Sequence, residues 1–202
     1  MEKKIAAFIS YLFHPLIIPT YLLVLMLNLP VFVFDQYSLL LKFMLVAYVF
    51  LLTFFVPAML MLMLKKQKII ESLKMKTRQE RVLPLAFMSI IYFVTFYFLY
   101  RLRILNVYAL FLLGTTLISI LALLINFKSK ISLHMIGMGG ITGMFLGLGI
   151  YYAGIELWFV YLLFILSGIV AYSRIVLTNH SVRQLFYGYL LGFSVIYLII
   201  II

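Results

Sequence analysis

Residues 157–177 read LWFVYLLFILSGIVAYSRIVL, a stretch of 21 residues that contains a single charge. A bilayer core about 30 Å thick is crossed by roughly 20 apolar residues in an α-helix. This stretch therefore predicts a membrane-spanning helix, and the pair Ser173-Arg174 near its end is the first polar feature of note.

Six further apolar runs lie outward from this stretch, at about 5–33, 38–64, 83–100, 104–126, 135–153 and 185–202. Pro15, Pro19 and Pro30 interrupt the first run, which predicts a kinked or re-entrant segment. It opens MEKK as a signal peptide does, but without a small-residue cleavage pattern it is expected to be an uncleaved anchor. We predict an all-α, polytopic transmembrane bundle of six or seven spans, forming one integral membrane domain over residues 1–202.

The composition excludes most other classes. Of 202 residues, 67% are hydrophobic and 10% charged, and the mean hydropathy is +1.23. A typical soluble domain is about 45–50% apolar and about 25% charged. A soluble enzyme, a disordered tail and a secreted disulfide scaffold are excluded, and the absence of Cys excludes thiol chemistry. No two carboxylates are expected to share a catalytic site; they are Glu2, Asp35, Glu71, Glu80 and Glu156.

The net charge of +11 indicates anionic lipid headgroups or phosphate as partners, not nucleic acid. With seven spans, one face carries 13 of the basic residues and the other carries 3. The larger group is expected in the cytoplasm, and the expected location of the protein is a bacterial inner membrane. That group is Lys3, Lys4, Lys65, Lys66, Lys68, Lys74, Lys76, Arg78, Arg81, Lys128, Lys130, Arg174 and Arg183; the smaller is Lys42, Arg101 and Arg103.

Two segments carry predictions about packing. The polar segment 65–81, KKQKIIESLKMKTRQER, is too charged to cross a membrane and predicts an interfacial amphipathic helix with Ile69, Ile70 and Leu73 toward lipid. Small residues at every fourth position, Gly139, Gly143 and Gly147, predict that two membrane helices approach closely.

Polar residues gather at span ends in three places. Lys74 and Arg81 lie nearly two helical turns apart before Pro84, so two aligned cations could hold a phosphate. Ser132 and His134 precede the glycine-rich span, where a helix start suits an anion and a His can act as a general acid. Structural alternatives for these two groups are positive-inside charge and a helix cap.

The third group follows the opening stretch. Arg174 offers a guanidinium fork for phosphate oxygens. His180 and Gln184 are four residues apart and share a helical face, so Gln184 could hydrogen-bond one imidazole nitrogen. The structural alternative for this third group is a loop whose polar side chains extend to the membrane surface without binding a ligand. His14 beside Pro15 lies away from these three groups and could bond a backbone carbonyl freed near the kink.

The three groups, in this order, resemble the type 2 phosphatidic acid phosphatase (PAP2) superfamily of membrane lipid phosphatases. That family's signature is Lys-x6-Arg-Pro, then Pro-Ser-Gly-His, then Ser-Arg-x5-His-x3-Asp. The corresponding stretches here are KMKTRQER (74–81) with Pro84, ISLH (131–134) and SRIVLTNHSVRQ (173–184). The resemblance covers residues 74–184 and implies a PAP2-like helical core.

The resemblance implies a role for each matching residue. His180 would attack phosphorus and form a phosphohistidine, oriented by Gln184, while His134 would protonate the leaving alkoxide and then activate water. Developing charge on the phosphoryl oxygens would be held by Lys74, Arg81, Arg174 and Ser132. No metal or other cofactor is implied. The expected substrate is a lipid mono- or diphosphate of the phosphatidate, phosphatidylglycerol phosphate or polyprenyl diphosphate class.

Three departures from the signature define the alternative. Gln184 replaces the family's Asp, Leu133 replaces Gly and Ile131 replaces Pro. A neutral amide stabilises an imidazolium less than a carboxylate does. The alternative is a catalytically inactive relative that binds or transports a phospholipid, and a third possibility is an unrelated transporter or assembly protein. Relatives usually act from the extracytoplasmic face, whereas the basic residues here favour the cytoplasmic one.

Overall fold

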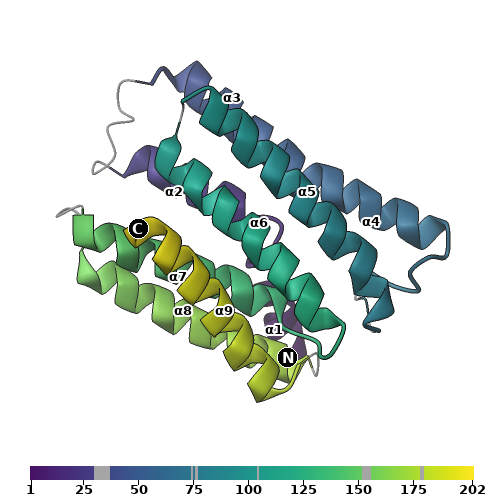
Figure 1. The fold of residues 1–202 in the computed structure, drawn as a ribbon. Helices are drawn as coiled ribbons and strands as arrows, with labels where there is room; N and C mark the ends of the chain where they lie inside the picture. Colours follow the sequence, from purple (N-terminus) through teal and green to yellow (C-terminus); the bar gives the residue numbers. More distant parts are fainter. Residues whose placement is uncertain (30–36, 74, 76, 104, 152–155, 178–179) are drawn as a thin grey trace. The chain divides into compact units, whose positions relative to one another are not determined.

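The computed structural model describes residues 1–29, 37–73, 75, 77–103, 105–151, 156–177 and 180–202. These residues form helices and connecting turns, with no strand in the described ranges, so the predicted all-α class is confirmed (Figure 1). In chain order the helices are α1 (Glu2–Leu12), α2 (Ile18–Asn28), α3 (Leu39–Phe50), the π-helical turn η1 (Leu51–Phe55), α4 (Val56–Lys66), α5 (Gln79–Arg101), α6 (Asn106–Asn126), α7 (Leu133–Tyr151), α8 (Leu157–Val176) and α9 (Val182–Ile201).

Six helices within the described ranges are long and apolar enough to cross a bilayer. Large apolar side chains on α5 and α8 remain exposed, including Ile90 at 61% and Trp158 at 63%. Apolar surface of this kind is stable against lipid and not against water. The chain is therefore a polytopic helical membrane protein. The spans are Leu39–Lys66, Gln79–Arg101, Asn106–Asn126, Leu133–Ile150, Leu157–Val176 and Val182–Ile201.

The N-terminal segment, predicted over 5–33 to be kinked or re-entrant, is interrupted in the structure. It forms two helices, α1 and α2, of 11 residues each, and each is about 16 Å long at 1.5 Å per residue. Pro15 has no N–H to continue α1, and Pro19 lies in the first turn of α2, where the missing donor costs nothing. Pro30 lies outside the described residues.

Clustering of backbone contacts divides the chain into two compact units. The first unit comprises Met1–Gln36 and Ile131–Ile202, and the second comprises Tyr37–Lys130. The single domain expected over residues 1–202 stays a prediction.

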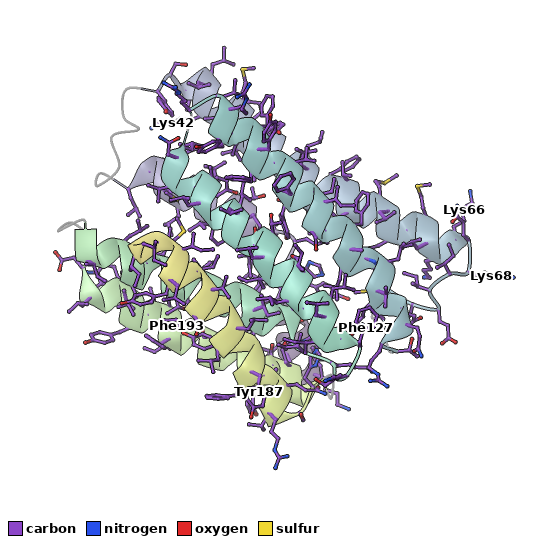
Figure 2. The ribbon with its side chains drawn as sticks, in the orientation of Figure 1. Lys42, Lys66, Lys68, Phe127, Tyr187 and Phe193 are labelled. Carbon is purple, nitrogen blue, oxygen red and sulfur yellow. The ribbon has the colours of Figure 1, made fainter. Side chains whose placement is uncertain are left out.

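In the second unit, α3, η1 and α4 form a continuous rod that packs against α5, and α5 packs against α6 (Figure 1). Pro57 cannot donate to the carbonyl of Thr53, and the π-helical turn absorbs that missing bond. Lys42 lies toward one end of the rod and Lys66 toward the other (Figure 2). Charges near both ends of an apolar rod agree with a transmembrane orientation.

The amphipathic helix predicted over 65–81 is wrong. Helix α4 ends at Lys66, and Lys68 adopts the left-handed conformation that commonly ends a helix, with φ of 59°. The carboxylate of Glu80 then accepts the backbone N–H groups of Glu71 (2.6 Å) and Thr77 (3.1 Å), so these donors are not available for helical bonds. Ile70 is buried at 2% exposure, whereas it was expected to face lipid.

In the first unit, α7 packs chiefly against α9. A Cβ atom at Gly139 would overlap the backbone oxygen of Tyr189, and one at Gly143 would overlap that of Phe193 (labelled in Figure 2). Gly192 on α9 makes the reciprocal close approach to Ile136. The predicted close approach of two helices at this glycine stripe is confirmed, because only glycine lets the two backbones come this near.

Candidate functional site

Two motif segments meet where α7 and α9 begin. The backbone N–H of Ser132 donates to the backbone oxygen of Gln184 over 3.4 Å. One turn further along α9, a Cβ at Gly188 would lie 2.8 Å from the backbone oxygen of Ser132. Gly188 thus allows the turn that carries Ser132 and His134 to rest on the start of α9, beside His180.

His180 is held by Gln184. Its Nδ1 lies 3.1 Å from Gln184 Oε1, and the same oxygen accepts the backbone N–H of Ser181 over 3.3 Å. A backbone N–H can only donate, so this atom of the amide is the acceptor oxygen, and Nδ1 of a neutral His180 is the protonated nitrogen. Nε2 of that tautomer carries a lone pair, which is the form a nucleophilic imidazole needs.

Gln184 has a second role as part of a helix cap. Ser181 Oγ accepts the backbone N–H of Gln184, and the Gln184 side chain returns to the backbone N–H of Ser181. This is a capping box, in which Ser and Gln three residues apart satisfy two donors at a helix start. The cap fixes the Gln184 side chain, and Gln184 in turn fixes the imidazole.

His134 lies in the first turn of α7 and is 8% exposed. Its Nε2 is 3.0 Å from the backbone oxygen of Ser10 and 3.2 Å from Ser10 Oγ. Arg174 contacts the same Ser10, and Gln184, whose backbone oxygen accepts the N–H of Ser132, holds the His180 ring. The structure therefore brings the three expected motif residues His134, Arg174 and His180 into one neighbourhood, from α7, the end of α8 and the turn before α9.

Arg174 and the serines complete this cluster. Arg174 lies in the last turn of α8, and its Nη1 donates to Ser10 Oγ at 2.5 Å. Ser132 is fully buried, and its Oγ has no hydrogen-bond partner among the described residues. A buried hydroxyl without a partner is costly unless something else satisfies it. Ser173, in contrast, bonds within its own helix, to Val170 O at 2.8 Å.

His14 joins the cluster from the bend between α1 and α2. Its ring meets that of His134 edge-to-face with centroids 5.6 Å apart. Its Nδ1 accepts the backbone N–H of Leu16 over 3.4 Å, whereas a bond to a backbone carbonyl was expected. Burial, and then the nearby charge of Arg174, lower the pKa of His14 from its ordinary value. The neutral form of this histidine is therefore favoured.

The first motif is only partly described. Lys74 lies outside the described residues, and Arg81 belongs to the second unit, where it is buried and its Nε donates to Met75 O at 3.2 Å. Helix α5 begins at Gln79, so the helical spacing expected between these two cations does not apply. Their proposed role in phosphate binding stays a prediction.

The sequence interpretation missed two features of the cluster. Ser10 was not considered, because a lone serine in an apolar run carries no signal by itself. The capping box was visible in principle, since Ser181-x-x-Gln184 precedes an apolar run, but Gln184 was considered only as a partner of His180. Among the described residues, no three His, Asp or Glu side chains come together as they would around a metal ion.

No family model, curated protein or solved structure matches this chain. The fold and the cluster thus define the class of protein, a polytopic helical membrane protein with a histidine–arginine–serine cluster at one end of a three-helix group.

Proposed function

We propose that this protein is a membrane lipid phosphatase or phosphotransferase that acts through a phosphohistidine at His180. The observation that carries the proposal is a chain of contacts: Ser10 joins His134 to Arg174, and Gln184, whose backbone oxygen accepts the N–H of Ser132, holds the His180 ring by Nδ1. Two imidazoles and a guanidinium supply a nucleophile, an acid and an anion binder, which are the three functions that phosphoryl transfer requires.

In the first step, Nε2 of His180 attacks phosphorus, the bond from phosphorus to the lipid oxygen breaks, and a proton passes from His134 to that oxygen. The products are a phosphohistidine and the lipid alcohol, or, from a diphosphate attacked at its terminal phosphorus, a phosphohistidine and the lipid monophosphate. Arg174 and Ser132 stabilise the phosphoryl oxygens as their charge grows. The unsatisfied hydroxyl of Ser132 supports this assignment, because a phosphoryl oxygen would give it the missing partner.

In the second step, water attacks the phosphohistidine while His134 accepts one of its protons. The bond from phosphorus to Nε2 breaks, inorganic phosphate leaves, and both histidines return to their starting states. An alcohol in place of water would make the same step a phosphotransfer. The sequence resemblance adds Lys74 and Arg81 as phosphate-binding residues.

The proposed substrate is a lipid mono- or diphosphate: phosphatidate, phosphatidylglycerol phosphate or a polyprenyl diphosphate. Spans with exposed apolar faces, such as α5 and α8, support a substrate that stays in the bilayer. Phosphate-binding groups at span ends match the depth of a lipid headgroup, since the headgroup region flanks the hydrocarbon core.

We further propose that the protein resides in a bacterial inner membrane with this cluster toward the cytoplasm. The hydroxyl of Tyr172, near the end of α8, donates to Glu2 at 2.6 Å, so α1 starts beside the end of α8 that carries Arg174. Lys3 and Lys4 next to Glu2 therefore add positive charge near this end of the first unit, which supports a cytoplasmic location.

Phosphate release tests the proposal. The purified protein is incubated with each lipid phosphate in the presence of a chelator, beside His180→Ala and, as a folded control, Gly168→Ala, a position where an added Cβ meets nothing within 4 Å. We expect release by the wild type and the control and none by His180→Ala. Full release by His180→Ala would overturn the mechanism.

A folded wild type that releases no phosphate from any lipid would favour the alternative, an inactive relative that binds or transports a phospholipid. Gln184 in place of a carboxylate is the observation behind that alternative. It predicts lipid-phosphate binding that needs Arg174 but shows no turnover.

A further inference from the structure

The first helix contributes a residue to the cluster that no motif includes. Ser10 lies near the end of α1 and is 7% exposed. Its backbone oxygen lies 3.0 Å and its Oγ lies 3.2 Å from His134 Nε2, and the same Oγ accepts a hydrogen bond from Arg174 at 2.5 Å. One residue thus contacts both the proposed acid–base group and a proposed phosphate-binding group.

The direction of these bonds follows from the donors and acceptors involved. A backbone carbonyl only accepts, so the contact with Ser10 O requires a proton on His134 Nε2. Arg174 only donates, so Ser10 Oγ accepts from it. Two donors from different helices therefore meet at one residue, which fixes the orientation of both the His134 ring and the guanidinium.

The segment that carries Ser10 is attached to α7 at further points. The His14 ring packs edge-to-face on the His134 ring at 5.6 Å. At Gly137, an added Cβ would overlap the Ile18 side chain, so Ile18 occupies the space that Gly137 leaves. Residues 10 to 18 thus contact the start of α7 at several points, and these contacts hold Ser10 in a defined place.

We propose that Ser10 is a positioning residue for phosphoryl transfer, which holds the His134 imidazole and the Arg174 guanidinium in one arrangement. This inference rests on the proposed function. Positioning matters because a displacement of about 1 Å in a catalytic group can cost about 10²-fold in rate. The hydroxyl and the carbonyl of Ser10 have separable roles, since substitution of the side chain leaves the carbonyl in place.

The test uses two substrates that differ in their need for an acid. A lipid monophosphate such as phosphatidate has an alkoxide leaving group that must be protonated, whereas p-nitrophenyl phosphate has a leaving group that departs without protonation. Impaired positioning of His134 therefore lowers the rate more for the lipid phosphate. A general loss of folded protein lowers both rates by the same factor.

Four proteins are compared with both substrates: wild type, Ser10→Ala, Ser10→Thr and the control Ser89→Ala. Ser89 matches Ser10 in burial, at 8% exposure, but its hydroxyl bonds only to Leu85 O among the contacts described, within its own helix. Ser10→Thr keeps the hydroxyl. If Ser10→Ala does not fold, Ser10→Cys gives the same comparison, because a thiol is close in size and a much weaker hydrogen-bonding group.

We expect Ser10→Ala to lower kcat for the lipid phosphate by about 10²-fold. For p-nitrophenyl phosphate we expect kcat to fall by only about tenfold. Ser10→Thr should restore most of the rate, and Ser89→Ala should resemble the wild type. Equal losses on both substrates, or no loss, would overturn the role of Ser10 while the wild-type activity upholds the proposed function. A wild type inactive on both substrates would overturn the proposed function, and the role of Ser10 with it.

Discussion

The two units of the chain each contain a buried polar cluster, and the two clusters differ in how their polar groups are satisfied. In the second unit, the Glu80 carboxylate accepts the backbone N–H groups of Glu71 and Thr77, so its acceptors are used to shape a loop. In the first unit, His134 and Arg174 both donate to Ser10, and the hydroxyl of Ser132 has no hydrogen-bond partner in the part of the chain described.

The Glu80 cluster of the second unit therefore shapes a loop, whereas the cluster of the first unit is suited to bind a ligand. A buried carboxylate filled by backbone donors has little capacity left for a further partner. A buried hydroxyl that lacks a hydrogen-bond partner, as Ser132 does among the described residues, has that capacity, and an anion oxygen would supply the acceptor. Substitutions in the first unit's cluster should therefore change turnover, and substitutions at Glu80 should change stability.

The largest effect is expected from Arg174. Arg174→Gln keeps a hydrogen-bond donor near Ser10 but removes the charge and the fork, and kcat/KM for a lipid phosphate should fall by about 10³-fold. Arg174→Lys should recover part of the loss, since charge alone replaces the fork incompletely. Steady-state kinetics of the two variants measure this. An Arg174→Gln enzyme with wild-type kinetics would remove Arg174 from the site.

The next effect concerns the packing that supports the cluster. Gly143→Leu forces a side chain against the backbone of Phe193 and should destabilise the first unit by about 3 kcal/mol. Gly168→Leu is the matched control, because nothing lies within 4 Å of a Cβ at Gly168. Thermal unfolding in detergent compares the two. Equal stability of both variants would show that α7 and α9 do not need this close approach.

A smaller loss of stability is expected at Glu80. Glu80→Ala leaves the backbone N–H groups of Glu71 and Thr77 without their acceptor and should cost about 1–2 kcal/mol, as the loss of a helix cap does. Glu80→Gln keeps one acceptor oxygen and should cost less. Unfolding temperatures measure both. An Ala variant as stable as the wild type would contradict the structural role assigned to this carboxylate.

The smallest effect is a gain at Gln184. Gln184→Glu keeps the length of the side chain and the capping box with Ser181, and it places a carboxylate at His180 Nδ1. A carboxylate stabilises the imidazolium better than an amide does, so kcat should rise by up to about tenfold. The opposite change in a serine-protease triad, from carboxylate to amide, lowers kcat by about 10⁴-fold. A fall in kcat, with the helix cap intact, would mean that the neutral amide is itself required.

Most of the helices could be predicted from the sequence, because the length of an apolar run fixes a membrane span directly. The glycine contact between α7 and α9 was also predictable, since Gly139 and Gly143 repeat with the helical period. The loop before α5 was not, because its shape depends on Glu80 bonding backward to residues 71 and 77, a choice that no local pattern reveals.

The candidate site was predictable to the extent that its residues lie in motifs at span ends. His134, Arg174 and His180 are predicted from the spacing and the resemblance of the motifs, and contacts through Ser10 and Gln184 link the segments that carry them. Ser10 and the packing of His14 on His134 were not predictable. They join residues 124 and 120 positions apart in the chain, and only the fold of the N-terminal segment onto α7 makes these contacts.

The central claim is that His180 carries the phosphoryl group, and trapping that intermediate tests it most directly. The protein is incubated briefly with p-nitrophenyl phosphate labelled at phosphorus, denatured in base to preserve phosphohistidine, and mapped by mass spectrometry. His134→Asn, which lacks the group that activates water, should accumulate label on His180, and His180→Ala should carry none. Turnover by the wild type with no label on His180 in either the wild type or His134→Asn, or label that persists in His180→Ala, would contradict the account.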